Sequence, residues 1–149
     1  MEQEDYLKKQ IEQMGRTLGA ILSNLIGSKN AGKINEGIEI TNQALKTELD
    51  FDIQEVMDIR TDDFIDIFIS EKKFTSNSFE KLAEILLLIA DNKESKEKEL
   101  LYEKCLIIFE YLERVENTYS LDRQRKIEQI KEILSTSINN YRYGKQKNK

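Results

Sequence analysis

The segment SFEKLAEILLLIAD, residues 78–91, is apolar on nearly all sides of the helix that its composition predicts. A helix that is apolar all round must be covered by other elements, so we expect this one at the centre of the fold. Just before it, Ser76, Asn77 and Ser78 with Glu80 form a helix start signal, in which Asn77 and Glu80 have capping-box spacing.

A stripe of apolar residues at steps of four and three predicts an amphipathic N-terminal helix over about residues 4–26. The stripe consists of Leu7, Ile11, Met14, Leu18, Ile21 and Leu25. A row of small residues, Gly15, Gly19 and Ser23, runs beside it at steps of four. Glycine costs about 1 kcal/mol per helical position relative to alanine. The row therefore indicates either tolerated glycines or a ridge that another helix approaches closely, within the chain or across a dimer.

Helical periodicity continues through the rest of the chain. It predicts further helices over about 34–49, 53–60, 62–72, 97–117 and 121–138, with Thr61 and Ser120 as N-caps. No run of four or more residues alternates with period two, so we expect no β-sheet. The predicted fold is an all-α array of antiparallel helical hairpins, either tetratricopeptide-like or an irregular helical bundle.

The length of 149 residues fits one domain. We expect a single all-α domain over residues 1–139, with the amphipathic helix at 1–27 and the hairpins at 34–139. A basic flexible tail is expected at 140–149, because its four basic residues are not balanced by acids and the apolar periodicity ends at Ile138.

The chain contains no histidine, no proline and a single cysteine, Cys105. Without histidine it lacks the usual general base near neutral pH and the commonest metal ligand, so serine and cysteine mechanisms that need a histidine partner are excluded. Cys105 lies on an apolar stripe, which predicts a buried, inert thiol. A lone cysteine also fits a reducing compartment, and the acidic N-terminus is unlike a signal peptide. We therefore expect a cytoplasmic protein.

Net charge is −5, and residues 34–92 hold fourteen acids against five bases. An acidic body repels phosphates, which makes nucleic acid an unlikely partner. The longest apolar run, Ile85 to Ala90, is far shorter than the ~20 residues of a membrane span. The expected partner is a protein, including a second copy of the chain bound through the N-terminal helix. No cofactor is expected.

Two resemblances to known families are present. Residues 82–134 resemble a pair of tetratricopeptide-type hairpins, because Tyr102-Glu-Lys-Cys-Leu106 is similar to that repeat's second-helix signature with cysteine in place of alanine. The N-terminal segment from Asp5 to Arg16, followed by Ile21 and Leu22, resembles an uncharacterised family of small helical proteins from low-GC Gram-positive and related bacteria. This second resemblance implies a bacterial source and no particular activity.

One alternative function is enzymatic and uses carboxylates alone. Glu36 and Glu39 precede Glu55 and Asp58 in a spacing similar to the acidic helix pairs of magnesium-dependent nucleoside triphosphate pyrophosphohydrolases. Both pairs, however, lie opposite the apolar stripes of their helices, which predicts that they face water. The segment from Gly27 to Lys33 has most of the phosphate-loop spacing, but Ile34 stands where the motif needs a hydroxyl.

A third function would use the C-terminal tail. Tyr141 to Lys149 interleaves aromatic and basic residues, a composition that can bind single-stranded RNA. The sequence favours a non-catalytic scaffold or protein-interaction module over both alternatives.

Overall fold

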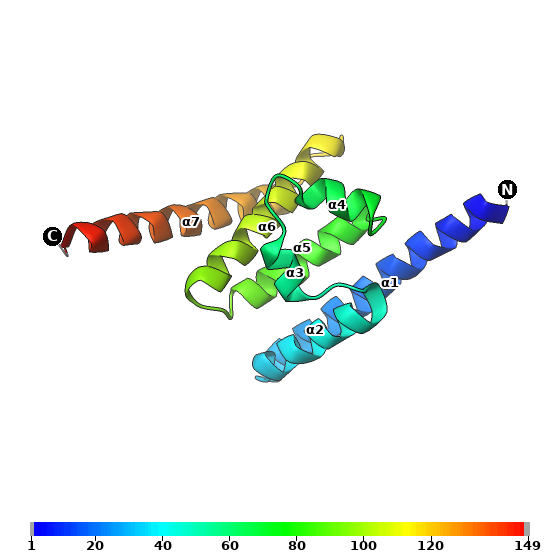
Figure 1. Ribbon diagram of the computed structural model, residues 1–149, viewed down its shortest axis with the longest axis horizontal. Coiled ribbons are helices and arrows are strands. Elements are labelled where there is room, and N and C mark those ends of the chain that lie inside the picture. The colour runs from blue at the N-terminus through cyan, green and yellow to red at the C-terminus, as the bar shows by residue number, and fades with distance from the viewer. Residues whose placement is uncertain (1, 148–149) are drawn as a thin grey trace.

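The computed structural model describes the backbone of residues 2–147 and the side chains of residues 2–136. Within that range it contains seven helices and no strand (Figure 1). The helices are α1 (Glu2–Asn30), α2 (Ile34–Leu49), α3 (Ile53–Asp58), α4 (Phe64–Ser70), α5 (Ser76–Ala90), α6 (Ser95–Val115) and α7 (Leu121–Lys147). The all-α fold class predicted from the sequence is confirmed.

Helix α5 lies at the centre of the fold, as its composition predicts, and forms an antiparallel hairpin with α6 (Figure 1). Its buried residues point to more than one side of the helix: Ser78, Phe79, Leu82, Ala83, Ile85, Leu86, Ile89 and Ala90. On α6 the apolar periodicity predicts a stripe through Leu101, Cys105, Ile108, Leu112 and Val115; the first four are buried, but Val115, the last residue of the helix, is 47% exposed. Truncating one of the large aliphatic residues in such a core to alanine typically costs about 2–5 kcal/mol.

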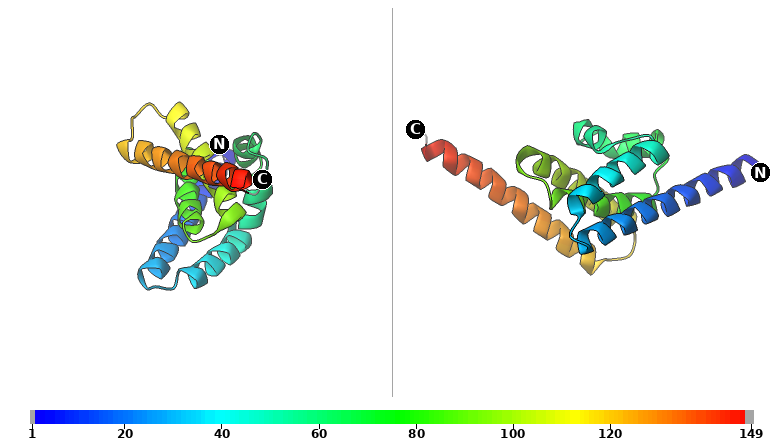
Figure 2. Two further views of the ribbon diagram at one scale, coloured as in Figure 1. Left: turned by 90° about the vertical axis from the view of Figure 1, so that its left-hand side faces the viewer. Right: turned by 90° about the horizontal axis from the view of Figure 1, so that it is seen from below.

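Helices α1 and α2 form a second antiparallel hairpin, and α1 also crosses α5. Leu18, Ile21 and Leu25 of the predicted stripe are buried in these contacts. With 29 residues, α1 is about 43 Å long and far exceeds the 16-residue α2. The first turns of α1 therefore project from the body, and α7 projects at the opposite end (Figure 2).

The short helices α3 and α4 lie against α6 and enclose an aromatic cluster. Two side chains fix the start of α3: Asn42 Oδ1 accepts the N–H of Ile53 at 2.8 Å, and the Asp52 carboxylate accepts the N–H of Glu55 at 2.9 Å. The cluster consists of Phe51, Phe64, Phe68, Phe74, Phe79 and Tyr111, with centroids of neighbouring rings 4.5 to 6.4 Å apart. It joins the loop after α2 to the central hairpin.

Helix α7 is attached to the body by Ile127 and Ile130 and by a buried arginine, Arg123. The guanidinium of Arg123 donates to Glu80 of α5 at 2.7 Å, to Glu113 of α6 at 3.0 Å, and to Glu116 at 2.9 Å. Burial alone would lower the pKa of Arg123, but its hydrogen bonds to the three carboxylates raise it overall. One cation thus connects three helices.

Several helix ends differ from the sequence predictions. The N-cap of α4 is Asp63, not Thr61, and that of α5 is Thr75, whose hydroxyl accepts the N–H of Ser78, so the capping box at Asn77 was wrong. The Ser120 N-cap is confirmed by its 3.2 Å bond from the N–H of Arg123.

The two terminal helices are longer than predicted, since α1 runs to Asn30 instead of 27, and α7 to Lys147 instead of 138. The side chains of residues 137–149 lie outside the described part of the chain. The residues whose side chains are not described include Ile138 and the basic tail expected at 140–149. Flexibility of this tail stays a prediction.

Replacing Arg123 by leucine should lower the free energy of unfolding by about 3 kcal/mol. This is the low end for a broken buried ion pair, because the three glutamates are partly exposed and water screens them. Arg125→Leu is the matched control, since Arg125 is exposed on the same helix and should change stability by less than about 0.5 kcal/mol. Urea denaturation of both variants measures the difference, and equal midpoints would contradict this role of Arg123.

Candidate functional site

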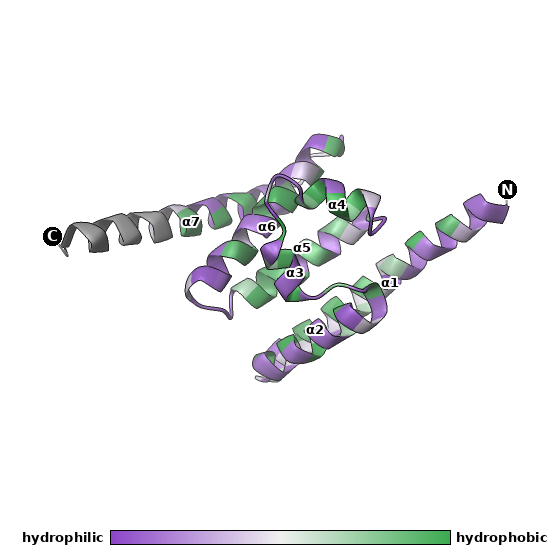
Figure 3. Ribbon diagram, in the orientation of Figure 1, coloured by the Kyte–Doolittle hydropathy of each residue, from purple (hydrophilic) through white to green (hydrophobic). Residues whose placement is uncertain are grey.

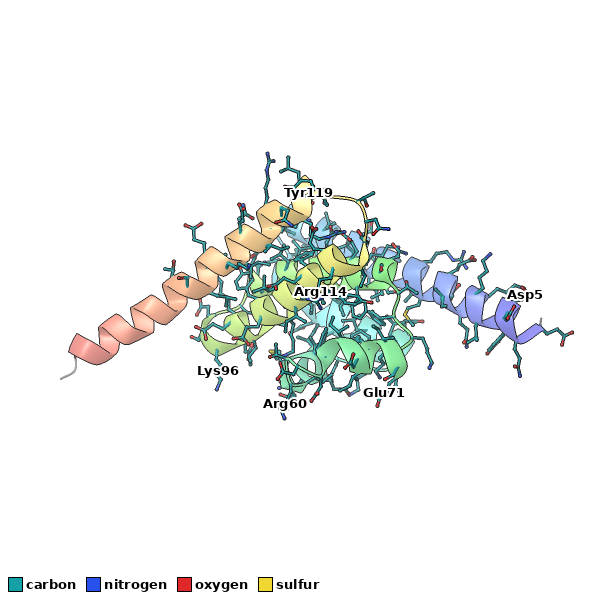
Figure 4. The ribbon with its side chains drawn as sticks, turned by 90° about the horizontal axis from the view of Figure 1, so that it is seen from above. Asp5, Arg60, Glu71, Lys96, Arg114 and Tyr119 are labelled. Carbon is teal, nitrogen blue, oxygen red and sulfur yellow. The ribbon has the colours of Figure 1, made fainter. Side chains whose placement is uncertain are left out.

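The projecting end of α1 exposes several large apolar side chains. Every residue from Glu2 to Gln13 is exposed, including Tyr6 at 63%, Leu7 at 49% and Ile11 at 36%. Leu7 and Ile11 continue the stripe that is buried further along the helix. Figure 3 shows hydrophobic positions recurring along the projecting part of α1. Figure 4 shows Asp5 at this end, well away from the body. The apolar face of α1 is therefore unpartnered over its first three turns.

A groove of about 640 Å³ lies where this free end meets the body. One wall is α1 itself, through Leu7, Ile11 and Met14. The opposite wall combines the end of α2, through Glu48 and Leu49, with the turn between α4 and α5, through Lys72 and Lys73. Gln10, Gln13 and Thr17 complete the lining. The α1 wall therefore combines apolar and uncharged polar side chains, and the far wall carries two lysines against one glutamate, a net positive charge.

The basic wall is held by local hydrogen bonds. Lys72 Nζ donates to the carbonyl of Asp50 at 2.9 Å, and Lys73 Nζ donates to the carbonyl of Ser70 at 2.7 Å. Asp50 and Lys73 both adopt the left-handed conformation, with φ of 60° and 61°, which ends α2 and turns the chain after α4. Phe74 then anchors the turn in the aromatic cluster. This side of the groove is preformed.

The row of small residues has a partner within the chain. Lys81 of α5 lies over it: Lys81 Nζ donates to the carbonyl of Gly15 at 2.8 Å, and a Cβ added at Gly19 would stand 3.5 Å from Lys81 Nζ. Ser23 is exposed and takes no part in this crossing. Gly15 and Gly19 are therefore covered by α5, which leaves the neighbouring Leu7–Ile11 face as the surface free for a second molecule.

Among the described glycines, Gly37 has the least room for a side chain, and no sequence pattern indicated it. A Cβ added there would lie 2.4 Å from Cβ of Ser28, far inside contact distance, so α2 can pack on α1 only with glycine at this position. Gly27, in contrast, has no neighbour within 4 Å of such a Cβ. The signal in the sequence was weak, since a lone glycine gives no indication of what faces it.

The four acidic residues of the enzymatic alternative are all exposed. Glu36 and Glu39 lie on α2, and Glu55 and Asp58 on α3, with Asp58 accepting a hydrogen bond from Gln54. Glu39 lines a shallow groove of about 240 Å³ that also contains Lys93 and Glu97. Among the described residues, no group of three or more acidic or cysteine side chains is placed to hold a metal ion.

The segment that resembles a phosphate loop belongs mostly to α1. The helix continues through Gly27 to Asn30, and only Ala31, Gly32 and Lys33 form the turn into α2. Gly32 has a φ of 73°, which explains the glycine there as a helix-ending residue.

Three reactive groups are buried in the central hairpin. Cys105 is fully buried and its thiol lies 3.5 Å from the carbonyl of Ala83; burial raises the pKa of Cys105, in agreement with the inert thiol predicted. Burial and then the hydrogen bond to Asp91 raise the pKa of Tyr102. Lys104 is 1% exposed, and burial lowers its pKa despite the nearby charges of Glu103 and Asp58.

Comparison of the chain with models of known protein families, with curated proteins and with solved structures found no match. The resemblances to tetratricopeptide-type hairpins and to a bacterial helical family stay predictions. Within residues 2–147 no helix combines the length and apolar character that a membrane span requires.

Substituting Gly37 by alanine should destabilise the protein, although alanine gains about 1 kcal/mol of helix propensity. The Cβ added at position 37 would lie 2.4 Å from the Cβ of Ser28. Both are Cβ atoms fixed to the backbone, so no change of rotamer can separate them. The double variant Gly37→Ala, Ser28→Gly should recover stability relative to Ser28→Gly alone. Gly27→Ala is the control and should stabilise. Thermal denaturation gives the four values, and a stabilising Gly37→Ala in the wild-type background would refute the close approach.

Replacing Lys104 by methionine should raise the free energy of unfolding at pH 7 by about 1 kcal/mol. Methionine keeps the unbranched stem and removes a buried charge whose hydrogen bond, to the Met57 carbonyl, is long at 3.4 Å. Because folding lowers the pKa of Lys104, wild-type stability should gain as pH rises toward the amine's ordinary value, so the advantage of methionine should shrink between pH 7 and 10. Lys131→Met, at an exposed position, is the control.

Proposed function

We propose that the protein is a non-catalytic helical module that binds a protein partner through the groove beside the free end of α1. The observation that carries the proposal is the continuous apolar stripe of α1, which is buried from Leu18 onward and exposed at Leu7 and Ile11. Contiguous exposed apolar surface beside a preformed groove is typical of protein-binding sites.

The occupant that such a groove suits is an amphipathic helix. The exposed residues follow the steps of four and three at which helices pair. Aliphatic anchors of a partner helix would cover Leu7 and Ile11, and acidic residues on its flank would lie near Lys72 and Lys73. Both a different protein and a second copy of this chain, joined through the N-terminal helix, fit this function.

The wider setting of the module is also part of the proposal. The single buried cysteine fits a reducing bacterial cytoplasm, and the hairpins of α5, α6 and α7 fit a tetratricopeptide-like use of stacked helices for protein binding. The exposed, dispersed positions of Glu36, Glu39, Glu55 and Asp58 favour a solvated acidic face over a nucleotide hydrolase. We expect no nucleoside triphosphate turnover with magnesium or manganese.

A photo-crosslinking amino acid at position 11 should form a discrete adduct with a partner protein in the cells that make this protein. The same residue at position 40 is the matched control, because Ile40 is also an exposed isoleucine, 63% exposed, and lies on α2. The adduct at position 11 should disappear when Leu7→Asp is added. Equal labelling at positions 11 and 40, or labelling insensitive to Leu7→Asp, would reject the groove as the binding surface.

A further inference from the structure

We propose that the occupant of the groove is the free end of α1 from a second copy of the chain, bound antiparallel about a two-fold axis. The proposal rests on the proposed function and commits it to one partner. Each copy would then supply both the inserted helix and the groove that receives it. A two-fold arrangement is the commonest way for one surface to cover itself.

The register follows from the stripe. Glu4, Leu7, Ile11 and Met14 succeed one another at steps of three, four and three, so they share one face of α1. An antiparallel pair that sets Leu7 of one copy beside Ile11 of the other makes two such contacts by symmetry. The same register sets Glu4 of one copy level with Met14 of the other.

Charge selects the antiparallel direction. The first turn of α1 is acidic, with Glu2, Glu4 and Asp5. Met14 lines the same groove as Lys72 and Lys73 of the far wall. Antiparallel pairing brings Glu4, the acid on the stripe, to this basic wall. Parallel pairing would place the two acidic turns side by side, where like charges repel.

The flanks of the stripe are compatible with the pair. Gln10 lies beside Ile11 on the groove side, and near the two-fold axis it would meet Gln10 of the second copy without a charge conflict. The opposite flank holds the exposed Lys8 in the free end, and Gly15 and Gly19 further along, where α5 covers them. Of the exposed faces of the free end, the Leu7 and Ile11 side is the one that continues the apolar stripe and borders the groove.

The size of the proposed dimer interface sets the affinity that we expect. The free end of α1 has about twelve residues and is about 18 Å long. Such an interface falls toward the small end of specific protein contacts, even though each copy covers a groove on the other. We therefore expect a reversible dimer with a dissociation constant in about the micromolar range.

Sedimentation velocity of the full chain over about 1–500 µM tests the proposal. The expected mass rises from 17.5 kDa toward twice that value. Leu7→Asp and Ile11→Asp should abolish the rise, while Ile40→Asp, an equal change at an exposed position on α2, should leave it intact. Circular dichroism confirms that each variant is folded, which the exposure of all three side chains favours. A chain that stays monomeric, or a dimer that survives Leu7→Asp, overturns the proposal.

A charge exchange tests the register. Glu4→Lys and Lys73→Glu should each weaken the dimer about tenfold, and the double variant should restore it. Asp5→Lys makes the same charge change off the stripe and should have a smaller effect. A double variant weaker than either single one would overturn the antiparallel register.

The two proposals fail separately. A monomeric chain that still forms the discrete adduct at position 11 with another protein refutes self-pairing and leaves the interaction module standing. If the chain is monomeric and forms no adduct at position 11, both the self-pairing and the interaction module are refuted. If the chain dimerises and the position 11 adduct joins two copies of it, both the self-pairing and the interaction module are supported.

Discussion

The fold depends on covering α5 on every side. Its fifteen residues span about 22 Å, and its buried side chains do not form a single stripe. No single neighbour can cover such a helix, so α6 takes one side and α1 another, while Phe79 joins α5 to the aromatic cluster under α3 and α4. The positions of the other helices follow from this requirement, including the attachment of α7 through Arg123 to Glu80 of α5.

A mismatch of helix lengths then creates the proposed binding surface. Helix α1 crosses a much shorter α5 and pairs with an α2 of 16 residues, whose last residue, Leu49, lines the groove together with Met14. The body leaves Leu7 and Ile11 49% and 36% exposed. The sequence nevertheless keeps the stripe apolar there. A helix that only had to complete this fold could carry polar residues at those positions, and this argues that they serve a contact outside the chain.

The features that sequence reasoning predicted well are local ones. The α1 stripe, the bounds of α2 and the Ser120 cap each depend on residues within one or two turns. The N-caps of α4 and α5 were missed because several polar residues stand next to each other and tertiary packing chooses among them. Arg123 was missed for a different reason: its three carboxylates come from positions 7, 10 and 43 residues away. The clash that fixes Gly37 likewise depends on a neighbour in another helix.

The crossing of α1 and α5 has a consequence for synthesis on the ribosome. The α1 and α2 hairpin is synthesised before α5, which covers Gly15 and Gly19 and is complete only at Ala90. At about 5–20 residues per second, the hairpin waits several seconds for that partner. During this time the side of α1 that α5 later covers is exposed along with Leu7 and Ile11, so the nascent chain presents a wider strip of α1 than the finished protein. Cotranslational pairing of neighbouring chains on one messenger RNA would begin from that strip.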